Sequence, residues 1–178
     1  MTDRQQKIID TALELFANQG YATTSTSKIA RQAGVSEGLI FRHFTNKEGL
    51  LDAIVQMGLE EMQTVAPRVL NEKDPKKLLE QAIYVPIYLI RNQPTFWKLL
   101  FSLKHQQPGM AQKYDESDIL ARLKESVEGA FRQLNYANPK AETRLLLVIL
   151  SGLVSELSDE DQMHQDAFVN FVREKYQL

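Results

Sequence analysis

The chain has 178 residues, of which 43% are hydrophobic and 25% are charged, and its formal net charge is −2. These values are ordinary for a soluble globular protein, and the length allows one compact unit or a small domain attached to a larger one. The absence of cysteine excludes a disulfide framework, a thiolate metal site and a cysteine nucleophile.

The sequence contains no segment with the pattern of a transmembrane helix or a signal peptide. The longest apolar run, residues 145–150, is far too short to cross a bilayer. The N-terminus is polar and leads into an amphipathic pattern, unlike the apolar centre of a signal peptide. We therefore expect a cytoplasmic protein without a membrane partner.

Helical periodicity runs through nearly the whole chain, and no segment alternates with period two for long enough to predict a strand. Gly20 and Gly34 end the first two helices, and Asp74-Pro75 is a typical helix start. Ser36 and Ser158 are expected N-caps. The helices that we expect in this all-α fold span about residues 3–17, 26–33, 37–44, 47–70, 75–92, 94–105, 115–134, 139–157 and 159–176.

The second and third of these helices have the proportions of a helix-turn-helix. Apolar residues fix the angle between them: Ile29, Ala30, Ala33, Val35, Ile40 and Phe44. Residues 1–47 carry six basic side chains against four acidic ones, the sign expected of a surface that meets phosphate. We predict a DNA-binding domain over residues 1–50, with the helix-turn-helix over about 25–44, and a helical-bundle regulatory domain over 51–178.

A dense motif in this front segment closely resembles the N-terminal domain of the tetracycline-repressor (TetR) family. It reads Phe16-x3-Gly20-Tyr21-x2-Thr24-Ser25-x3-Ile29-Ala30-x2-Ala33-Gly34-Val35-Ser36-x-Gly38-x2-Phe41-x-His43-Phe44-x2-Lys47-x2-Leu50. The resemblance covers about residues 5–55 and implies a DNA-binding transcriptional regulator, most often a repressor. It also implies a homodimer on a pseudo-palindromic site in double-stranded DNA, with no enzymatic activity and no cofactor.

The resemblance implies a role for each matching polar position. Ser25 and Thr26 would contact a phosphate at the start of the second helix. Ser36 and Gly38 would allow close approach to DNA, and Leu39 would make apolar contact with a base, such as a thymine methyl. The remaining DNA-backbone contacts implied by the resemblance are His43, Lys47, Lys28 and Arg42.

Two positions depart from the family pattern. The family usually has a phosphate-binding tyrosine where this chain has Phe41, which can only pack. Glu37 places an acid near the expected phosphates. An acid in the first turn of a helix favours the helix dipole, and a carboxylate can also accept from a cytosine amine, so both roles stay open for Glu37.

The regulatory domain is rich in large side chains at helical spacing. Such residues are usually core, but they can also line a cavity for a small, mostly apolar effector. The same region of the regulatory domain also contains other residues that could border such a cavity: Pro86, His105, Met110 and Tyr114. The candidate effector-binding residues are Tyr84, Tyr88, Arg91, Trp97, Phe101 and Phe131.

The helix over 139–157 is apolar almost all round, which predicts burial on two sides, one of them against a second copy of the chain. Its Gly152 would permit close approach of another helix, and the last helix adds a further apolar face. The residues that we assign to this dimer interface are Leu145, Ile149, Gly152, Leu153, Phe168, Phe171 and Val172.

Two alternatives remain at this level. The protein could be an activator rather than a repressor, or a helical enzyme or carrier whose front end is degenerate. Asp161 and His164 are three residues apart on one helix, but a bundle metal site needs several facing carboxylates, so we expect no metal.

Overall fold

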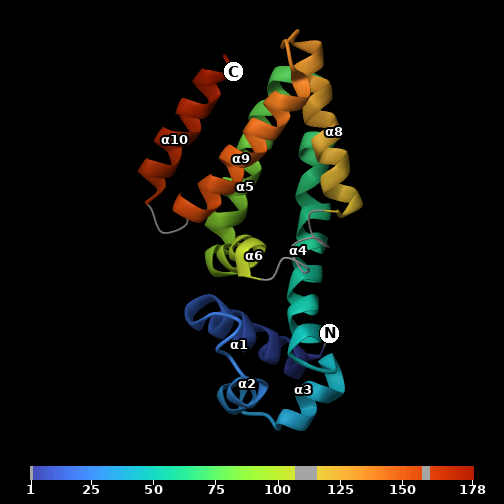
Figure 1. The fold of residues 1–178 in the computed structure, drawn as a ribbon, viewed down its shortest axis with the longest axis vertical. Helices are drawn as coiled ribbons and strands as arrows, with labels where there is room; N and C mark the ends of the chain where they lie inside the picture. The colour runs from blue at the N-terminus through green and yellow to red at the C-terminus, as the bar shows by residue number, and fades with distance from the viewer. Residues whose placement is uncertain (1, 107–115, 158–160) are drawn as a thin grey trace.

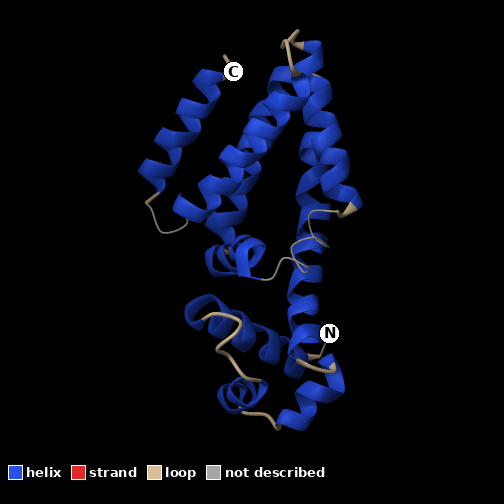
Figure 2. Ribbon diagram, viewed as in Figure 1, coloured by secondary structure: helices blue, strands red, loops and turns tan. Residues whose placement is uncertain are grey.

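The computed structural model describes residues 2–106, 116–157 and 161–178, and these ranges contain helices and no strand (Figures 1 and 2). The all-α prediction is therefore confirmed. The helices are α1 (Asp3–Gln19), α2 (Thr26–Ala33), α3 (Glu37–Phe44), α4 (Lys47–Leu70), α5 (Pro75–Asn92), α6 (Pro94–Gln106), α8 (Asp118–Gln133), α9 (Pro139–Leu157) and α10 (Gln162–Lys175).

Local capping explains most helix starts. The Asn46 side chain accepts from the Gly49 N–H, and the Asp74 side chain accepts from two N–H groups in the first turn of α5, which has proline at its first position. Ser36 occupies the expected N-cap of α3 but makes no side-chain capping bond.

Two predicted boundaries were displaced. Helix α8 begins three residues later than expected, after Ser117, and α10 begins at Gln162. The cap of α10 is Asp161, whose carboxylate accepts from the His164 N–H, instead of the predicted Ser158. Ser158, Met110 and Tyr114 lie outside the described residues.

The molecule is elongated, with α1–α3 at one end and a bundle of α5, α8 and α9 at the other (Figure 1). The long helix α4 runs from the helix-turn-helix into the bundle, where it packs against α5 and α8. Helix α6 lies between the two ends and packs against α1, α5 and α9. Helix α10 lies on the outside of the bundle against α5.

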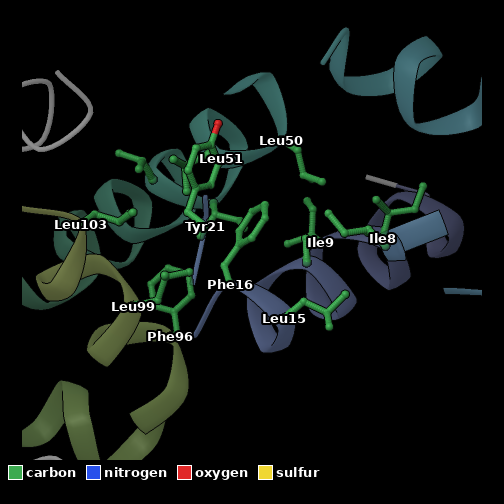
Figure 3. Close-up of a cluster of buried hydrophobic side chains, with 14 of the residues drawn as sticks. Ile8, Ile9, Leu15, Phe16, Tyr21, Leu50, Leu51, Phe96, Leu99 and Leu103 are labelled. Atoms are coloured by element: carbon green, nitrogen blue, oxygen red, sulfur yellow. The ribbon is translucent and has the colours of Figure 1, made fainter. Parts of the chain in front are cut away.

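Two clusters of buried apolar side chains hold this arrangement together. The first joins α1–α3 to the first half of α4 and to α6, so that Phe16 of α1 and Phe96 of α6 belong to the same core (Figure 3). The second fills the bundle between α5, α8, α9 and α10. Packing therefore continues past residue 50, where we expected the domain boundary.

We predict that Gly49→Ala destabilises the helix-turn-helix end of the protein. A Cβ at position 49 would collide with the backbone carbonyl of Phe44, which cannot move aside without distorting α3. Overpacking of this kind costs about 1–3 kcal/mol. Urea unfolding should show that loss in the free energy of unfolding.

Gly129→Ala is the matched control, because a Cβ there meets nothing within 4 Å on α8. Alanine should then stabilise the helix by up to about 1 kcal/mol through its higher helix propensity. Equal stability of the two variants would contradict the collision at Gly49.

Candidate functional site

The turn between α2 and α3 is built around one left-handed residue. Gly34 has φ 68° and ψ 36°, and its N–H and that of Val35 both bond carbonyls near the end of α2. A side chain at this φ would be strained, so glycine permits the reversal. Ile29, Ala33 and Ile40 are fully buried and fix the angle between the two helices.

This packing leaves one polar surface on α2 and α3. Ser25, Ser36, Gly38, Phe41 and Arg42 are exposed. The other predicted DNA contacts, which are Thr26, Lys28, Leu39, His43 and Lys47, are half-buried at its edges. The structure therefore brings all ten predicted residues to the helix-turn-helix, although some of their side chains already have partners within the protein.

Thr26 and Glu37 are bonded to each other. The Thr26 hydroxyl donates to the Glu37 carboxylate at 2.6 Å and so links the first turn of α2 to the first turn of α3. This contact is a third role for Glu37, beside the dipole and base contacts weighed from sequence. It also occupies a hydroxyl that we expected to be available for phosphate.

Lys47 is folded back onto its own domain. Its ammonium donates to the carbonyls of Tyr21 at 2.9 Å and Thr24 at 3.0 Å, and it lies 4.3 Å from the centre of the Tyr21 ring. Burial raises the pKa of the Tyr21 hydroxyl, so this ring stays neutral beneath the cation. Lys47 therefore ties the start of α4 to the turn between α1 and α2.

Two further residues differ from expectation. Phe41 is about half exposed instead of packed, because its position on α3 faces away from the core that Ile40 and Phe44 enter. Lys28 bonds the Gln19 side-chain oxygen. Among the predicted basic contacts, Arg42 is exposed to solvent, whereas Lys28, His43 and Lys47 are half-buried.

A cavity of about 450 Å³ lies in the regulatory part of the molecule. Its walls come from α4, α5, α6, α8 and α9 and are mostly aliphatic. The polar residues among the lining residues are Lys124, Arg144 and Ser151. The apolar ones are Met62, Ala66, Val69, Ala82, Val85, Pro86, Leu89, Phe101, Leu120, Leu123, Val127, Leu146, Leu147, Val148 and Leu150.

Of the six candidate effector-binding residues, Phe101 lines this cavity and the other five do not. Trp97 and Phe131 are completely buried in the two cores, which the alternative core interpretation anticipated. Tyr84 and Tyr88 are exposed on α5. Sequence reasoning followed the aromatic residues and missed the aliphatic walls, because aliphatic residues of a cavity and of a core have the same helical spacing.

Arg91, which is outside the cavity lining, instead contacts α10. Its guanidinium bonds the Asp166 carboxylate at 2.7 Å and the Gln165 side-chain oxygen at 2.9 Å, both on α10. On the same side of α10, Arg173 pairs with Glu80 of α5. These contacts hold α10 against α5.

The predicted dimer residues divide into two groups. Leu153 and Val172 are buried in the second apolar cluster of this chain, so this structure does not expose them to a second copy. Ile149 is half-buried and packs against that same core. The remaining four, Leu145, Gly152, Phe168 and Phe171, are exposed on α9 and α10.

The fold and this front surface define a helix-turn-helix DNA-binding protein with a helical bundle that encloses a cavity. Residues 8–54 match the family model described as "Bacterial regulatory proteins, tetR family". Residues 8–54 are therefore a helix-turn-helix domain of the TetR type, as the sequence motif predicted.

Individual relatives agree with this assignment. The HTH-type transcriptional regulator YerO of Bacillus subtilis (strain 168) is 30% identical over 106 residues, which are 57% of this chain and 36% of YerO. The match thus spans about a third of YerO. The nucleoid occlusion factor SlmA of Aliivibrio fischeri (strain MJ11) is 25% identical over 182 residues, 98% of this chain and 88% of SlmA.

The fold of the whole chain is also found among solved structures. FadR from Bacillus subtilis, in complex with stearoyl-CoA, is similar with a TM-score of 0.74 and 23% identity, over 95% of each chain. The family model and YerO are both described as regulatory proteins. Within the described residues no helix combines the length and apolar character that a membrane span needs.

We predict that Lys47→Ala lowers the stability of the protein, because carbonyls of the α1–α2 turn lose their donor. The expected loss is about 1–3 kcal/mol in the free energy of unfolding, measured with urea. Operator affinity should fall in parallel, since the turn positions α2.

Arg42→Ala is the contrasting variant. Its side chain is exposed, so stability should stay within about 0.5 kcal/mol of wild type. Affinity for all DNA sequences should fall, and the slope of log affinity against log salt should decrease by about 1 for one lost phosphate contact. An unchanged salt slope for Arg42→Ala would show that Arg42 makes no phosphate contact.

Proposed function

We propose that this protein is a ligand-responsive transcriptional repressor that binds a pseudo-palindromic operator as a homodimer. The exposed surface of α3, with Ser36, Gly38 and Arg42 toward solvent, carries the DNA-binding half of the proposal. A helix presented in this way enters a major groove with its N-terminal residues at the base edges. Leu39 would supply apolar contact to a base.

Exposed apolar side chains on two helices, α9 and α10, support the homodimer. The described residues have eight large hydrophobic side chains that are exposed, and five of these lie on α9 and α10: Leu145, Val148, Met163, Phe168 and Phe171. Val148 and Phe171 are each more than 60% exposed. Gly152 on the same helix as Val148 has open space around its Cα, which leaves room for a partner helix.

Two-fold symmetry connects these side chains to the operator. A patch that is shared by identical subunits forms an isologous interface, and such a dimer presents its two recognition helices with two-fold symmetry. The operator half-sites would then lie one helical turn of DNA, or a multiple, apart.

We expect Phe171→Glu to give monomers. A charge in the centre of an apolar interface must be desolvated without a partner, so association becomes unfavourable. Sedimentation at micromolar concentration should show a monomer in place of a dimer, and affinity for the two-half-site operator should fall to that for a single half-site.

Tyr88→Glu is the control for this change. Tyr88 has an exposed aromatic ring on α5 and not on α9 or α10, and the new carboxylate there can pair with Arg68. This variant should remain dimeric. A wild-type chain that sediments as a monomer would remove the homodimer from the proposal.

The cavity supports an effector with an apolar tail and an anionic group. Aliphatic walls favour a hydrocarbon tail, while Lys124 on α8 and Arg144 on α9 place two cations among the lining residues. FadR, which shares the fold, was solved with stearoyl-CoA, a ligand that combines a long apolar chain with anionic groups.

The same helices connect the cavity to the DNA-binding end. Helix α4 lines the cavity with Met62, Ala66 and Val69 and begins directly after α3. Helix α6 lines it with Phe101, whose ring centre is 6.3 Å from that of Trp97 in the front core. A ligand that fits one arrangement of α4 and α6 better would shift the population toward it and change the spacing of the recognition helices.

Saturated fatty acids of increasing length, each compared with the alcohol of the same length, would test the effector class. Each added CH2 should strengthen release from the operator by up to about fourfold until the cavity is full. The acids should release the protein at lower concentration than the alcohols.

Arg144→Ala should remove this preference for acids. Arg122→Ala, which removes an exposed cation from α8 outside the cavity lining, should keep it. Alcohols that act as well as acids in the wild type would contradict the anionic group. Raised transcription in a strain lacking the gene would distinguish a repressor from an activator.

A further inference from the structure

The ring of His43 is held by a side chain from a different helix. The Gln5 amide nitrogen, Nε2, lies 3.3 Å from Nδ1 of His43, which joins the first turn of α1 to the end of α3. The two residues are 38 positions apart in sequence. His43 is half-buried and lines an open surface hollow together with Thr45 and Asp52.

The orientation of the Gln5 amide is fixed by the capping box of α1. Its oxygen, Oε1, accepts the backbone N–H of Thr2 at 2.8 Å and is 3.1 Å from the Thr2 hydroxyl. A backbone N–H can only donate, so the end of the amide that faces Thr2 must be the oxygen. The end that faces His43 is therefore the NH₂ group, which has donors and no acceptor.

This polarity determines where the proton of the neutral ring is. Because the Gln5 NH₂ donates to Nδ1, that nitrogen must present its lone pair, and the ring proton must be on Nε2. We propose that Gln5 is a positioning residue for DNA binding, which fixes neutral His43 as the Nε2–H tautomer so that it can donate to a backbone phosphate. The inference rests on the proposed function and on the phosphate contact that the TetR resemblance implies for His43.

The tautomer matters because phosphate oxygens only accept hydrogen bonds. A neutral ring with its proton on Nδ1 would turn a lone pair toward the phosphate, and the contact would be repulsive. With Gln5 in place, His43 is a donor without having to carry a charge. The start of α1 thus contributes to DNA binding through α3, although it need not touch DNA itself.

The tautomer can be measured in the free protein, independently of any DNA. Nitrogen-15 spectra of histidine-labelled protein distinguish a protonated from an unprotonated ring nitrogen, and His43→Gln identifies the His43 signals among the three histidines. In the neutral form of the ring, we expect the proton on Nε2. A proton on Nδ1, or an even mixture of both forms, would overturn the proposal.

Gln5→Glu reverses the polarity while it keeps the capping box, since glutamate serves equally at this position of the box. A carboxylate only accepts, so Nδ1 should become protonated. Gln6→Glu adds the same charge one residue along, where the native side chain bonds Asp10 and not His43. That control should keep the wild-type spectrum, and a change of equal size in both variants would assign the effect to charge alone.

DNA binding then connects the tautomer to function. Gln5→Ala should weaken operator binding roughly fivefold through the loss of one well-placed hydrogen bond, and in a His43→Leu background the same change should have no further effect. Thr2→Ala is the matched control, because it removes the capping hydroxyl but keeps the backbone N–H that orients Gln5. It should leave the tautomer unchanged and operator affinity within about twofold of wild type.

The outcomes separate this inference from the function on which it rests. Operator binding that is intact in His43→Leu, which has no side-chain donor, would overturn the role of Gln5 in DNA binding and would leave the repressor assignment untouched. If the wild-type protein does not bind an operator at all, the proposed function is wrong, whatever the tautomer of His43.

Discussion

The rest of the structure depends on the apolar core that joins α1 to α4 and α6. A helix-turn-helix of about fifty residues buries too little apolar surface to be robust alone. Here Phe16 and Leu15 of α1 pack in one cluster with Phe96 and Trp97 of α6 and with Leu51 of α4 (Figure 3). The DNA-binding end is therefore completed by helices that also belong to the regulatory bundle, and the two parts cannot move independently.

This shared core gives the cavity a physical route to the recognition helix. Helices α4 and α6 each contribute side chains to the front core and to the cavity wall. Close-packed side chains do not deform continuously, so a change at Phe101 or Met62 must be accommodated by a shift of the whole helix. Any effector acts only through its difference in affinity between the two arrangements.

The polar surface of the helix-turn-helix is organised before DNA arrives. Thr26 bonds Glu37, Lys47 bonds carbonyls of the α1–α2 turn, and Gln5 orients His43. Each contact joins two different elements, so each restricts the angle or the rotamer with which a side chain meets the DNA backbone. Restricting these side chains in the free protein lowers the entropy that is lost on binding.

The sequence by itself determined what depends on near neighbours along the chain. The helix-turn-helix, its glycine turn at Gly34 and most helix boundaries follow from spacing and caps, which act within about four residues. The TetR-type motif was dense enough to identify the family. The choice between core, cavity and partner interface was decided only by the tertiary structure.

Trp97 and Phe101 show why sequence alone could not separate core from cavity. They lie one turn apart on α6, yet Trp97 is in the core and Phe101 lines the cavity. On α9 the sequence showed apolar residues nearly all round, but only the packing of α5 and α8 determined that Leu153 faces inward and Leu145 outward. The physical reason is that helical periodicity specifies which residues share a face. What covers that face depends on the crossing angles of helices that are distant in sequence.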